Sequence, residues 1–191
     1  MIESMIEIFL ANVIIVIFFL ADFLIRKDKT AVSINKTKDD KNSTKIIIFT
    51  FLIICIASEL LEYFRWGEFK NKTISRVALA FMLSGLIIRI HSMSQLKKFY
   101  TRMLIITDQQ KLVKTGIYKI VRHPGYSGTV LIWIFFGLAI QNLIVFFIAF
   151  ILISFAYNYR IRIEEQMLLT QFGKEYADYK KSSWKIIPYV Y

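Results

Sequence analysis

The sequence has very few of the residues that proteins use for covalent staples and metal sites. It contains one cysteine, Cys55, and two histidines, His91 and His123. A disulfide needs two cysteines and a structural zinc site usually takes four Cys or His ligands, so we expect neither a disulfide framework nor a metal site. The seven glycines form no G-x-G-x-x-G pattern, and this argues against a Rossmann domain.

Acidic residues are also scarce. The 191 residues carry 14 Asp and Glu against 25 Lys and Arg, for a net charge of +11, yet 56% of the chain is hydrophobic and the mean hydropathy is +0.50. This is too apolar for an ordinary soluble domain. A basic surplus indicates nucleic acid or an anionic membrane as partner. The long apolar runs favour membrane lipids over nucleic acid, with the positive charge facing the cytoplasmic leaflet.

Apolar runs occupy residues 6–25, 46–61, 77–90 and 127–157. A helix needs about 20 apolar residues to cross a bilayer, so the fourth run is too long for one span. The polar pair Gln141-Asn142 near its middle predicts the tip of a helical hairpin. We therefore predict an all-α integral membrane fold with about five transmembrane helices, the last two forming a hairpin.

The distribution of Lys and Arg orients these helices. Residues 26–45 carry seven Lys and Arg against three Asp, and residues 89–122 and the tail after residue 159 are also basic. The positive-inside rule then places the N-terminus outside and the C-terminus in the cytoplasm. A cleaved signal peptide is disfavoured, because the leading residues are acidic and no small-residue cleavage site follows.

The chain is expected to form one integrated domain with two parts. Residues 1–95 hold three transmembrane helices and a flexible cytoplasmic loop at 26–45, and residues 96–191 hold the hairpin and a helical tail. The third helix is expected to extend toward residue 111, with Arg89 and His91 reaching the headgroups. The last hairpin helix continues past the membrane until Gly173, which ends or kinks it.

The segment 114–126, KTGIYKIVRHPGY, is the strongest functional signal. It brings Tyr118, Arg122, His123 and Tyr126 to the mouth of a membrane helix, where ionisable groups are costly unless they serve a purpose. A simple connecting loop is the alternative. Pro124 restricts the backbone of the residue before it to extended conformations.

A second signal lies in RIRIEE, where Arg160 and Glu164 are four residues apart and share one helix face. From spacing alone, a surface ion pair and a functional pair are equally compatible with this pattern.

Together, GIYKIVRHPGY, the apolar hairpin, RIRIEEQMLLTQFGKEYADY and the closing Ile187-Pro188 resemble the C-terminal half of the isoprenylcysteine carboxyl methyltransferase family. The wider group includes phospholipid methyltransferases. The resemblance covers about residues 100 to 190. It implies transfer of a methyl group from S-adenosylmethionine to a lipophilic acceptor, with the cofactor bound on the cytosolic side.

The resemblance also implies roles for particular residues. The expected cofactor-binding residues are Gln110, Lys111, Leu112, Val113, Tyr118, His123, Pro124, Gly125, Tyr126 and Glu164. The expected catalytic residues are Arg160, Glu164 and Arg122, with Arg160 also binding the acceptor. Relatives often have a histidine where this chain has Gln110.

These residue types suit the chemistry. A methyl sulfonium has a neutral thioether as leaving group, so catalysis depends on alignment and on exclusion of water. Arg160 is suited to hold an acceptor carboxylate through two hydrogen bonds. Glu164 is suited to bind the amino group of the cofactor's methionine moiety or to brace Arg160.

Several alternatives stay open at this stage. The acceptor is expected to be the carboxylate of an isoprenylcysteine-like lipid, and a phospholipid amine, a thiol or a phenolic or pyrone hydroxyl are the other candidates. An NADPH-dependent reductase related to the sterol reductases and a non-enzymatic membrane protein are the competing functions. The sequence does not indicate the oligomeric state.

Overall fold

The computed structural model describes residues 2–24, 40–96 and 112–189. Across these residues the secondary structure is helical apart from two isolated bridges. The elements are α1 (Ile2–Leu24), α3 (Ser43–Phe64), α4 (Lys72–Leu96), the 3-10 turn η2 (Gly116–Lys119), α5 (Pro124–Ala139), α6 (Leu143–Phe172) and α7 (Lys174–Lys181). This confirms the predicted all-α membrane fold.

Four helices, α1, α3, α4 and α6, are long and apolar enough to cross a membrane. Helix α5 has 16 residues and is apolar but shorter. At 1.5 Å per residue it extends about 24 Å, less than the roughly 30 Å of a bilayer core. The described part of the chain therefore has four helices long enough to span a membrane and a shorter fifth helix, α5.

The helices extend beyond the predicted apolar runs. The run at 46–61 becomes Ser43–Phe64 and the run at 77–90 becomes Lys72–Leu96, because helical hydrogen bonding continues into the polar flanks. The expected loop at 26–45 is therefore wrong at its end, where Ser43 already begins α3. The rest of that loop, and the expected extension of the third helix to residue 111, lie outside the described residues.

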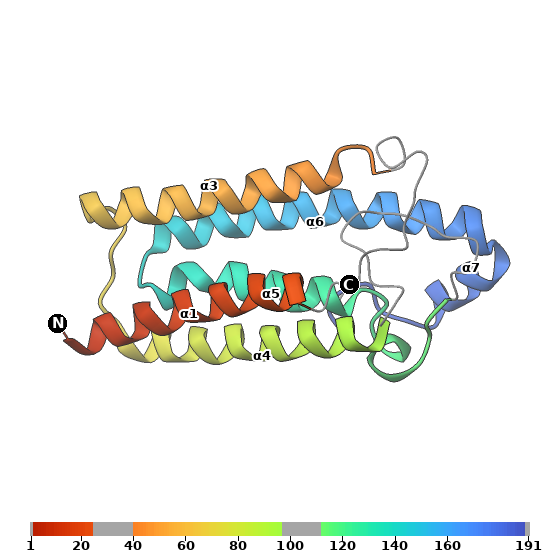
Figure 1. Ribbon diagram of the computed structural model, residues 1–191, viewed down its shortest axis with the longest axis horizontal. Coiled ribbons are helices and arrows are strands. Elements are labelled where there is room, and N and C mark those ends of the chain that lie inside the picture. The colour runs from red at the N-terminus through yellow and green to blue at the C-terminus, as the bar shows by residue number, and fades with distance from the viewer. Residues whose placement is uncertain (1, 25–39, 97–111, 190–191) are drawn as a thin grey trace.

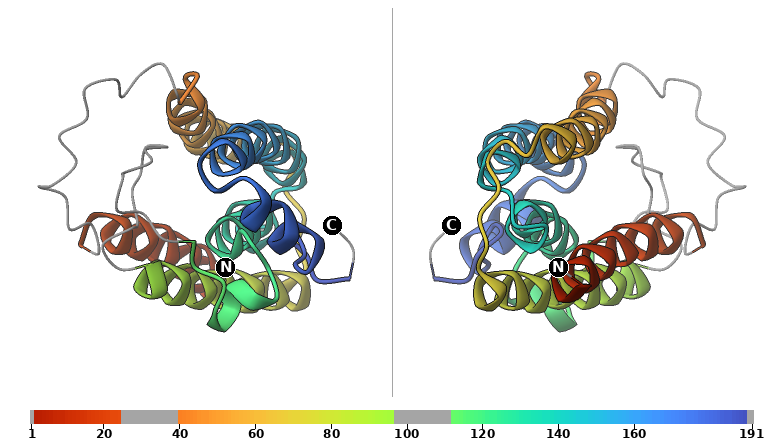
Figure 2. Two further views of the ribbon diagram at one scale, coloured as in Figure 1. Left: turned by 90° about the vertical axis from the view of Figure 1, so that its right-hand side faces the viewer. Right: turned by 90° about the vertical axis from the view of Figure 1, so that its left-hand side faces the viewer.

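Helix α5 lies at the centre of the bundle, with α3 and α6 side by side on one flank and α1 and α4 on the other (Figures 1 and 2). Three aromatic rings join these layers. Phe51 of α3 stacks on Trp133 of α5 with ring centroids 4.3 Å apart, and Phe18 of α1 meets both rings edge-on. This cluster anchors the apolar core.

The backbones of α4 and α5 approach closely at two glycines. A Cβ atom on Gly128 would collide with the carbonyl oxygen of Gly85, and one on Gly85 would lie 2.6 Å from the carbonyl oxygen of Gly128. Small residues allow membrane helices to pack backbone to backbone in this way. The contact fixes where α5 begins relative to α4.

The predicted hairpin tip is confirmed. Asn142 caps α6, accepting a hydrogen bond from the Val145 N–H (3.0 Å), and its side-chain amide donates to the carbonyl oxygen of Trp66 in the α3–α4 connection (2.9 Å). Gln141 adopts a left-handed conformation with φ 58°. The two loops at this end of the bundle are therefore joined by neutral hydrogen bonds.

The predicted break at Gly173 is also confirmed. Helix α6 continues to Phe172, and Gly173, with φ 51°, redirects the chain into α7. A positive φ is readily adopted by glycine. Helix α7 consequently lies at the end of the bundle where α5 begins, opposite the N-terminus of α1 (Figure 1).

The expectation that Arg89 reaches the headgroups is wrong. Its side chain is only 9% exposed, and its Nη2 lies 2.7 Å from Oδ1 of Asp22 in α1. A partner within the bundle removes the need to extend toward the surface. His91, by contrast, is exposed.

Candidate active site

The RHPG segment is held by the C-terminal tail. Trp184 N–H donates to the Ile120 carbonyl (2.9 Å), Arg122 N–H donates to the Trp184 carbonyl (2.8 Å), and His123 N–H donates to the Lys185 carbonyl (3.2 Å). Pro124 then starts α5, where the missing N–H of proline costs nothing. The loop therefore has a fixed backbone rather than that of a simple connecting turn.

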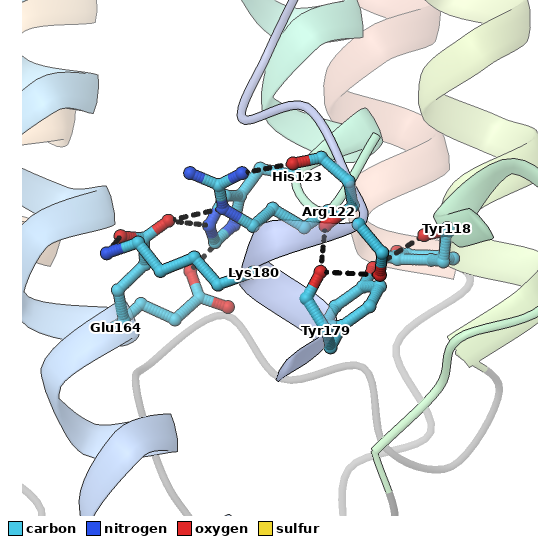
Figure 3. Close-up of polar contacts among 9 residues, drawn as sticks. Tyr118, Arg122, His123, Glu164, Tyr179 and Lys180 are labelled. Atoms are coloured by element: carbon cyan, nitrogen blue, oxygen red, sulfur yellow. Dashed lines mark hydrogen bonds and ion pairs between the residues drawn. The ribbon is translucent and has the colours of Figure 1, made fainter. Parts of the chain in front are cut away.

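Arg122, His123 and Lys180 converge on one stretch of α6 (Figure 3). Glu165 receives a hydrogen bond from Arg122 Nε (2.6 Å), lies 3.4 Å from His123 Nε2 and pairs with Lys180 Nζ (2.8 Å). Arg122 also donates from Nη1 to the Ser183 carbonyl (2.7 Å). The Arg122 side chain therefore joins α6 to the C-terminal tail.

Glu164, next to Glu165, faces the other nitrogen of the same imidazole. Its Oε2 lies 3.8 Å from His123 Nδ1, and this oxygen is buried without a hydrogen-bond partner among the described residues. The side chain is 27% exposed, so part of it reaches the surface. A buried carboxylate oxygen that accepts no hydrogen bond is unusual, because buried polar atoms normally have hydrogen-bond partners.

Arg160 lies one helical turn before Glu164 and is buried. Its Nη1 donates to Asp40 Oδ1 (2.6 Å), Ser43 Oγ (2.8 Å) and Thr44 Oγ1 (2.8 Å). Its Nε donates to the Tyr126 hydroxyl (3.2 Å). Arg160 thus joins the start of α3 to the RHPGY segment, and this excludes the interpretation of Arg160 and Glu164 as a simple surface ion pair.

Asp40 is the partner of Arg160 and also binds the first turn of α3. Its carboxylate accepts from the Thr44 N–H (3.0 Å), the Ser43 hydroxyl (2.9 Å) and the Thr44 hydroxyl (2.9 Å). Burial alone would raise the pKa of Asp40, but the Thr44 N–H, the charge of Arg160 and the hydroxyl of Ser43 lower it below its usual value. Asp40 is therefore a carboxylate at neutral pH.

The model of the isoprenylcysteine carboxyl methyltransferase (ICMT) family matches residues 78–170, which include both RHPGY and RIRIEE. The chain is ICMT-like. The matched range does not include Asp40, Lys180 or the tail that pairs with the loop, although all three contact matched residues.

Curated relatives carry related names. The chain is 31% identical over 143 residues to the protein-S-isoprenylcysteine O-methyltransferase of Dictyostelium discoideum, a match that covers 72% of this chain and 59% of the relative. It is 28% identical over 159 residues to a probable protein-S-isoprenylcysteine O-methyltransferase of Oryza sativa subsp. indica, covering 78% and 81%. A Saccharomyces cerevisiae relative of the same name is 38% identical over 82 residues, covering 41% and 33%.

A solved structure has the same fold. It is that of the eukaryotic intramembrane Ras methyltransferase ICMT, with a TM-score of 0.62 and 21% identity, covering 90% of this chain and 61% of that one. At this identity the likeness shows the fold alone. The chain spans about three fifths of the length of this structure and of the Dictyostelium relative.

Three buried tyrosines, Tyr118, Tyr176 and Tyr179, lie near the ICMT-like loop. The Tyr179 hydroxyl of α7 donates to the Tyr118 carbonyl (2.6 Å), and the Tyr118 hydroxyl donates to the Ser92 carbonyl of α4 (3.3 Å). Burial raises the pKa of Tyr179 to about 12, and burial also raises the pKa of Tyr118 and Tyr176. These hydroxyls therefore stay protonated at neutral pH, and those of Tyr118 and Tyr179 act as hydrogen-bond donors.

The remaining predicted cofactor-binding residues lie in different surroundings. Leu112 and Val113 are half-buried, and Gly125 offers its carbonyl to Arg89 (3.2 Å). Gln110 and Lys111 lie outside the described residues, so their expected contacts with a cofactor stay predictions.

Sequence reasoning missed three residues that the structure brings to the site: Asp40, Glu165 and Lys180. Asp40 had a usable signal, because an acid followed closely by Ser and Thr before an apolar run is typical of a helix start. Glu165 was visible only as the second acid of RIEE. Lys180 had no distinguishing pattern within the basic tail.

Proposed function

We propose that this chain is an integral membrane methyltransferase that transfers the methyl group of S-adenosylmethionine to the carboxylate of an isoprenylcysteine-like lipid. The observation that carries the proposal is the buried Oε2 of Glu164, which accepts no hydrogen bond among the described residues and lies beside His123, one turn from Arg160. The names of the curated relatives support the same reaction.

The site fits the amphipathic, charged cofactor. Glu164 would accept hydrogen bonds from the ammonium of its methionine moiety, which supplies the hydrogen bond that Oε2 lacks. His123 and Tyr126, whose rings stack with centroids 5.6 Å apart, would contact its remaining polar groups. When bound, the cofactor supplies an electrophilic methyl group. The site would be completed by Tyr118, Leu112, Val113, Pro124, Gly125 and, as predicted, Gln110 and Lys111.

Arg160 would hold the acceptor carboxylate and align one of its oxygens with that methyl group. A guanidinium is suited to this task, because its planar donors match a carboxylate. Asp40, Ser43 and Thr44 keep Nη1 in place, so the guanidinium plane is set before the acceptor arrives. Preorganisation of this kind lowers the cost of binding.

Arg122 would act through the loop instead of touching a reactant. It clamps Glu165 to the tail at Ser183, and this orients the adjacent His123. We therefore propose a positioning role for Arg122.

We further propose that this end of the bundle faces the cytoplasm. It carries Lys180, Lys181 and Lys185, whereas the hairpin tip at the other end is uncharged. The positive-inside rule supports the N-terminus outside and the cofactor site inside.

Calorimetry of the detergent-solubilised protein with S-adenosylhomocysteine tests the proposal. Wild type should bind, and Glu164→Ala should weaken binding at least tenfold because it removes a charge-assisted hydrogen bond worth roughly 1.5–3 kcal/mol. A folded wild-type protein that binds NADPH but not S-adenosylhomocysteine would overturn the proposal in favour of a reductase.

The acceptor requires a second experiment. Purified protein should methylate a farnesylated cysteine with a free carboxylate and leave its methyl ester unchanged, measured by mass spectrometry. Methylation of a phospholipid amine, a thiol or a phenol in place of the carboxylate would contradict the assigned acceptor while leaving the methyltransferase assignment intact.

A further inference from the structure

Helices α1 and α4 run side by side and are joined by two ion pairs at opposite ends. Asp22 pairs with Arg89 (2.7 Å) and Glu7 pairs with Arg76 (2.9 Å). The two differ in burial: the Arg89 side chain is 9% exposed, and that of Arg76 is 65% exposed. A fully buried pair within a membrane bundle is costly, and such residues are functional more often than not.

The buried pair touches the proposed cofactor loop. Arg89 uses Nη2 for Asp22, and its Nη1 donates to the carbonyl oxygen of Gly125 (3.2 Å), two residues after His123. The Arg89 guanidinium also lies over the ring of Phe18, 5.7 Å from its centroid. Helix α1 thus contacts the Arg89 guanidinium through Asp22 and Phe18. The third contact of the guanidinium is with Gly125 in the first turn of α5.

The neighbouring part of α4 also contacts the RHPGY segment. The Ser92 hydroxyl donates to the Arg89 carbonyl (2.8 Å), and the Ser92 carbonyl accepts from Tyr118 (3.3 Å). A Cβ atom on Gly125 would lie 3.1 Å from Ser92 Oγ and 3.4 Å from Arg89 Nη1. This stretch of α4 is therefore packed directly against the RHPGY segment.

We propose that Arg89, oriented by Asp22, is a positioning residue for cofactor binding: it fixes the Gly125 carbonyl and with it the loop from His123 to Tyr126. The inference rests on the proposed function of that loop. Arginine is required because its two terminal nitrogens bind Asp22 and Gly125 at once, and the single nitrogen of lysine cannot reproduce this fork.

Arg89→Lys therefore separates the two contacts. The lysine retains a charge partner for Asp22 but loses the second bond, so the variant should fold with a Tm close to wild type. Its affinity for S-adenosylhomocysteine should fall about tenfold, as expected for one charge-assisted hydrogen bond. In turnover assays the KM for the methyl donor should rise while the KM for the acceptor stays unchanged.

Arg76→Lys is the matched control. It makes the same change in the other ion pair of the same two helices, far from the loop, and should leave both Tm and cofactor affinity unchanged. Equal losses of affinity in Arg76→Lys and Arg89→Lys would overturn the inference, because they would report a general effect of the α1–α4 contact.

A double variant covers the case in which Arg89→Lys folds poorly. Asp22→Asn with Arg89→Gln removes both buried charges together, so no charge is left unpaired, and the shorter amide at position 89 cannot bind the side chain at position 22 and the Gly125 carbonyl at once. It should show the same tenfold loss. An affinity within twofold of wild type in the folded variant overturns the inference, whereas a wild type without affinity overturns the proposed function instead.

Discussion

The hairpin tip and the opposite end of the helix bundle are held together by different forces. At the hairpin tip, Asn142 and its neighbours join two short loops through neutral hydrogen bonds to backbone groups. At the opposite end, buried charges from distant parts of the sequence hold one another: Asp40 with Arg160, Asp22 with Arg89, and Glu165 with Arg122. Neutral bonds suffice to close a turn. The charged end is costly to assemble, and this cost is expected where a ligand must be bound.

The largest loss of stability is expected from Glu165→Ala, at the charged end of the bundle. It leaves the buried Arg122 without its carboxylate and Lys180 without its partner, and removing one member of a buried ion pair typically costs about 3–5 kcal/mol. Thermal unfolding in detergent measures the loss. The control is Glu175→Ala, whose half-exposed pair with Lys114 should contribute less than about 1 kcal/mol. Similar losses in both variants would show that burial does not set the strength of these ion pairs.

A smaller loss of stability is expected from Asp40→Asn. The amide keeps one accepting oxygen, but it loses the second acceptor and the charge opposite Arg160. Stability at neutral pH should therefore fall by about 2 kcal/mol, measured by thermal unfolding in the same detergent.

The same residue predicts a dependence on pH. Because the folded-state pKa of Asp40 is lowered, its contribution is complete above the usual Asp pKa of about 4 and is lost as the pH falls through the lower folded value. Wild type should therefore lose stability on acidification below about pH 4 more steeply than Asp40→Asn. Parallel acid unfolding curves for the two proteins would contradict this assignment.

The smallest effect is expected at the hairpin tip. Asn142→Ala removes the cap of α6 and the bond to Trp66, which should cost about 1 kcal/mol. Binding of S-adenosylhomocysteine should be unchanged, because the tip is at the end of the bundle away from the loop. A loss of cofactor affinity in a folded Asn142→Ala protein would show that the two ends are coupled.

Much of the fold was predictable because membrane helices follow simple rules. The apolar runs located the long helices, and Gln141-Asn142 and Gly173 marked their turns, because apolar length and turn-forming residues are local properties. The exact helix ends were not predictable, since α3 begins where Asp40 binds its first turn and α4 continues into polar residues.

The site was predictable only in part, for a related reason. Arg160, Glu164 and His123 were found from motif and spacing, but their partners come from elsewhere in the chain. Asp40 is 120 residues from Arg160, and Asp22 is 67 residues from Arg89. Which of two adjacent acids, Glu164 or Glu165, binds Arg122 depends on helix rotation, which the sequence does not specify to that precision.

The pairing between the tail and the RHPG segment limits how this protein can be recombined with its relatives. A chimera that exchanges only residues 78–170, the range that the family model matches, would bring in a foreign loop. Its N–H groups at positions 122 and 123 would then face carbonyls of Trp184 and Lys185 that were inherited from the other parent. Domain swaps and C-terminal fusions should therefore carry the loop and residues 184–185 together as one transplantable unit.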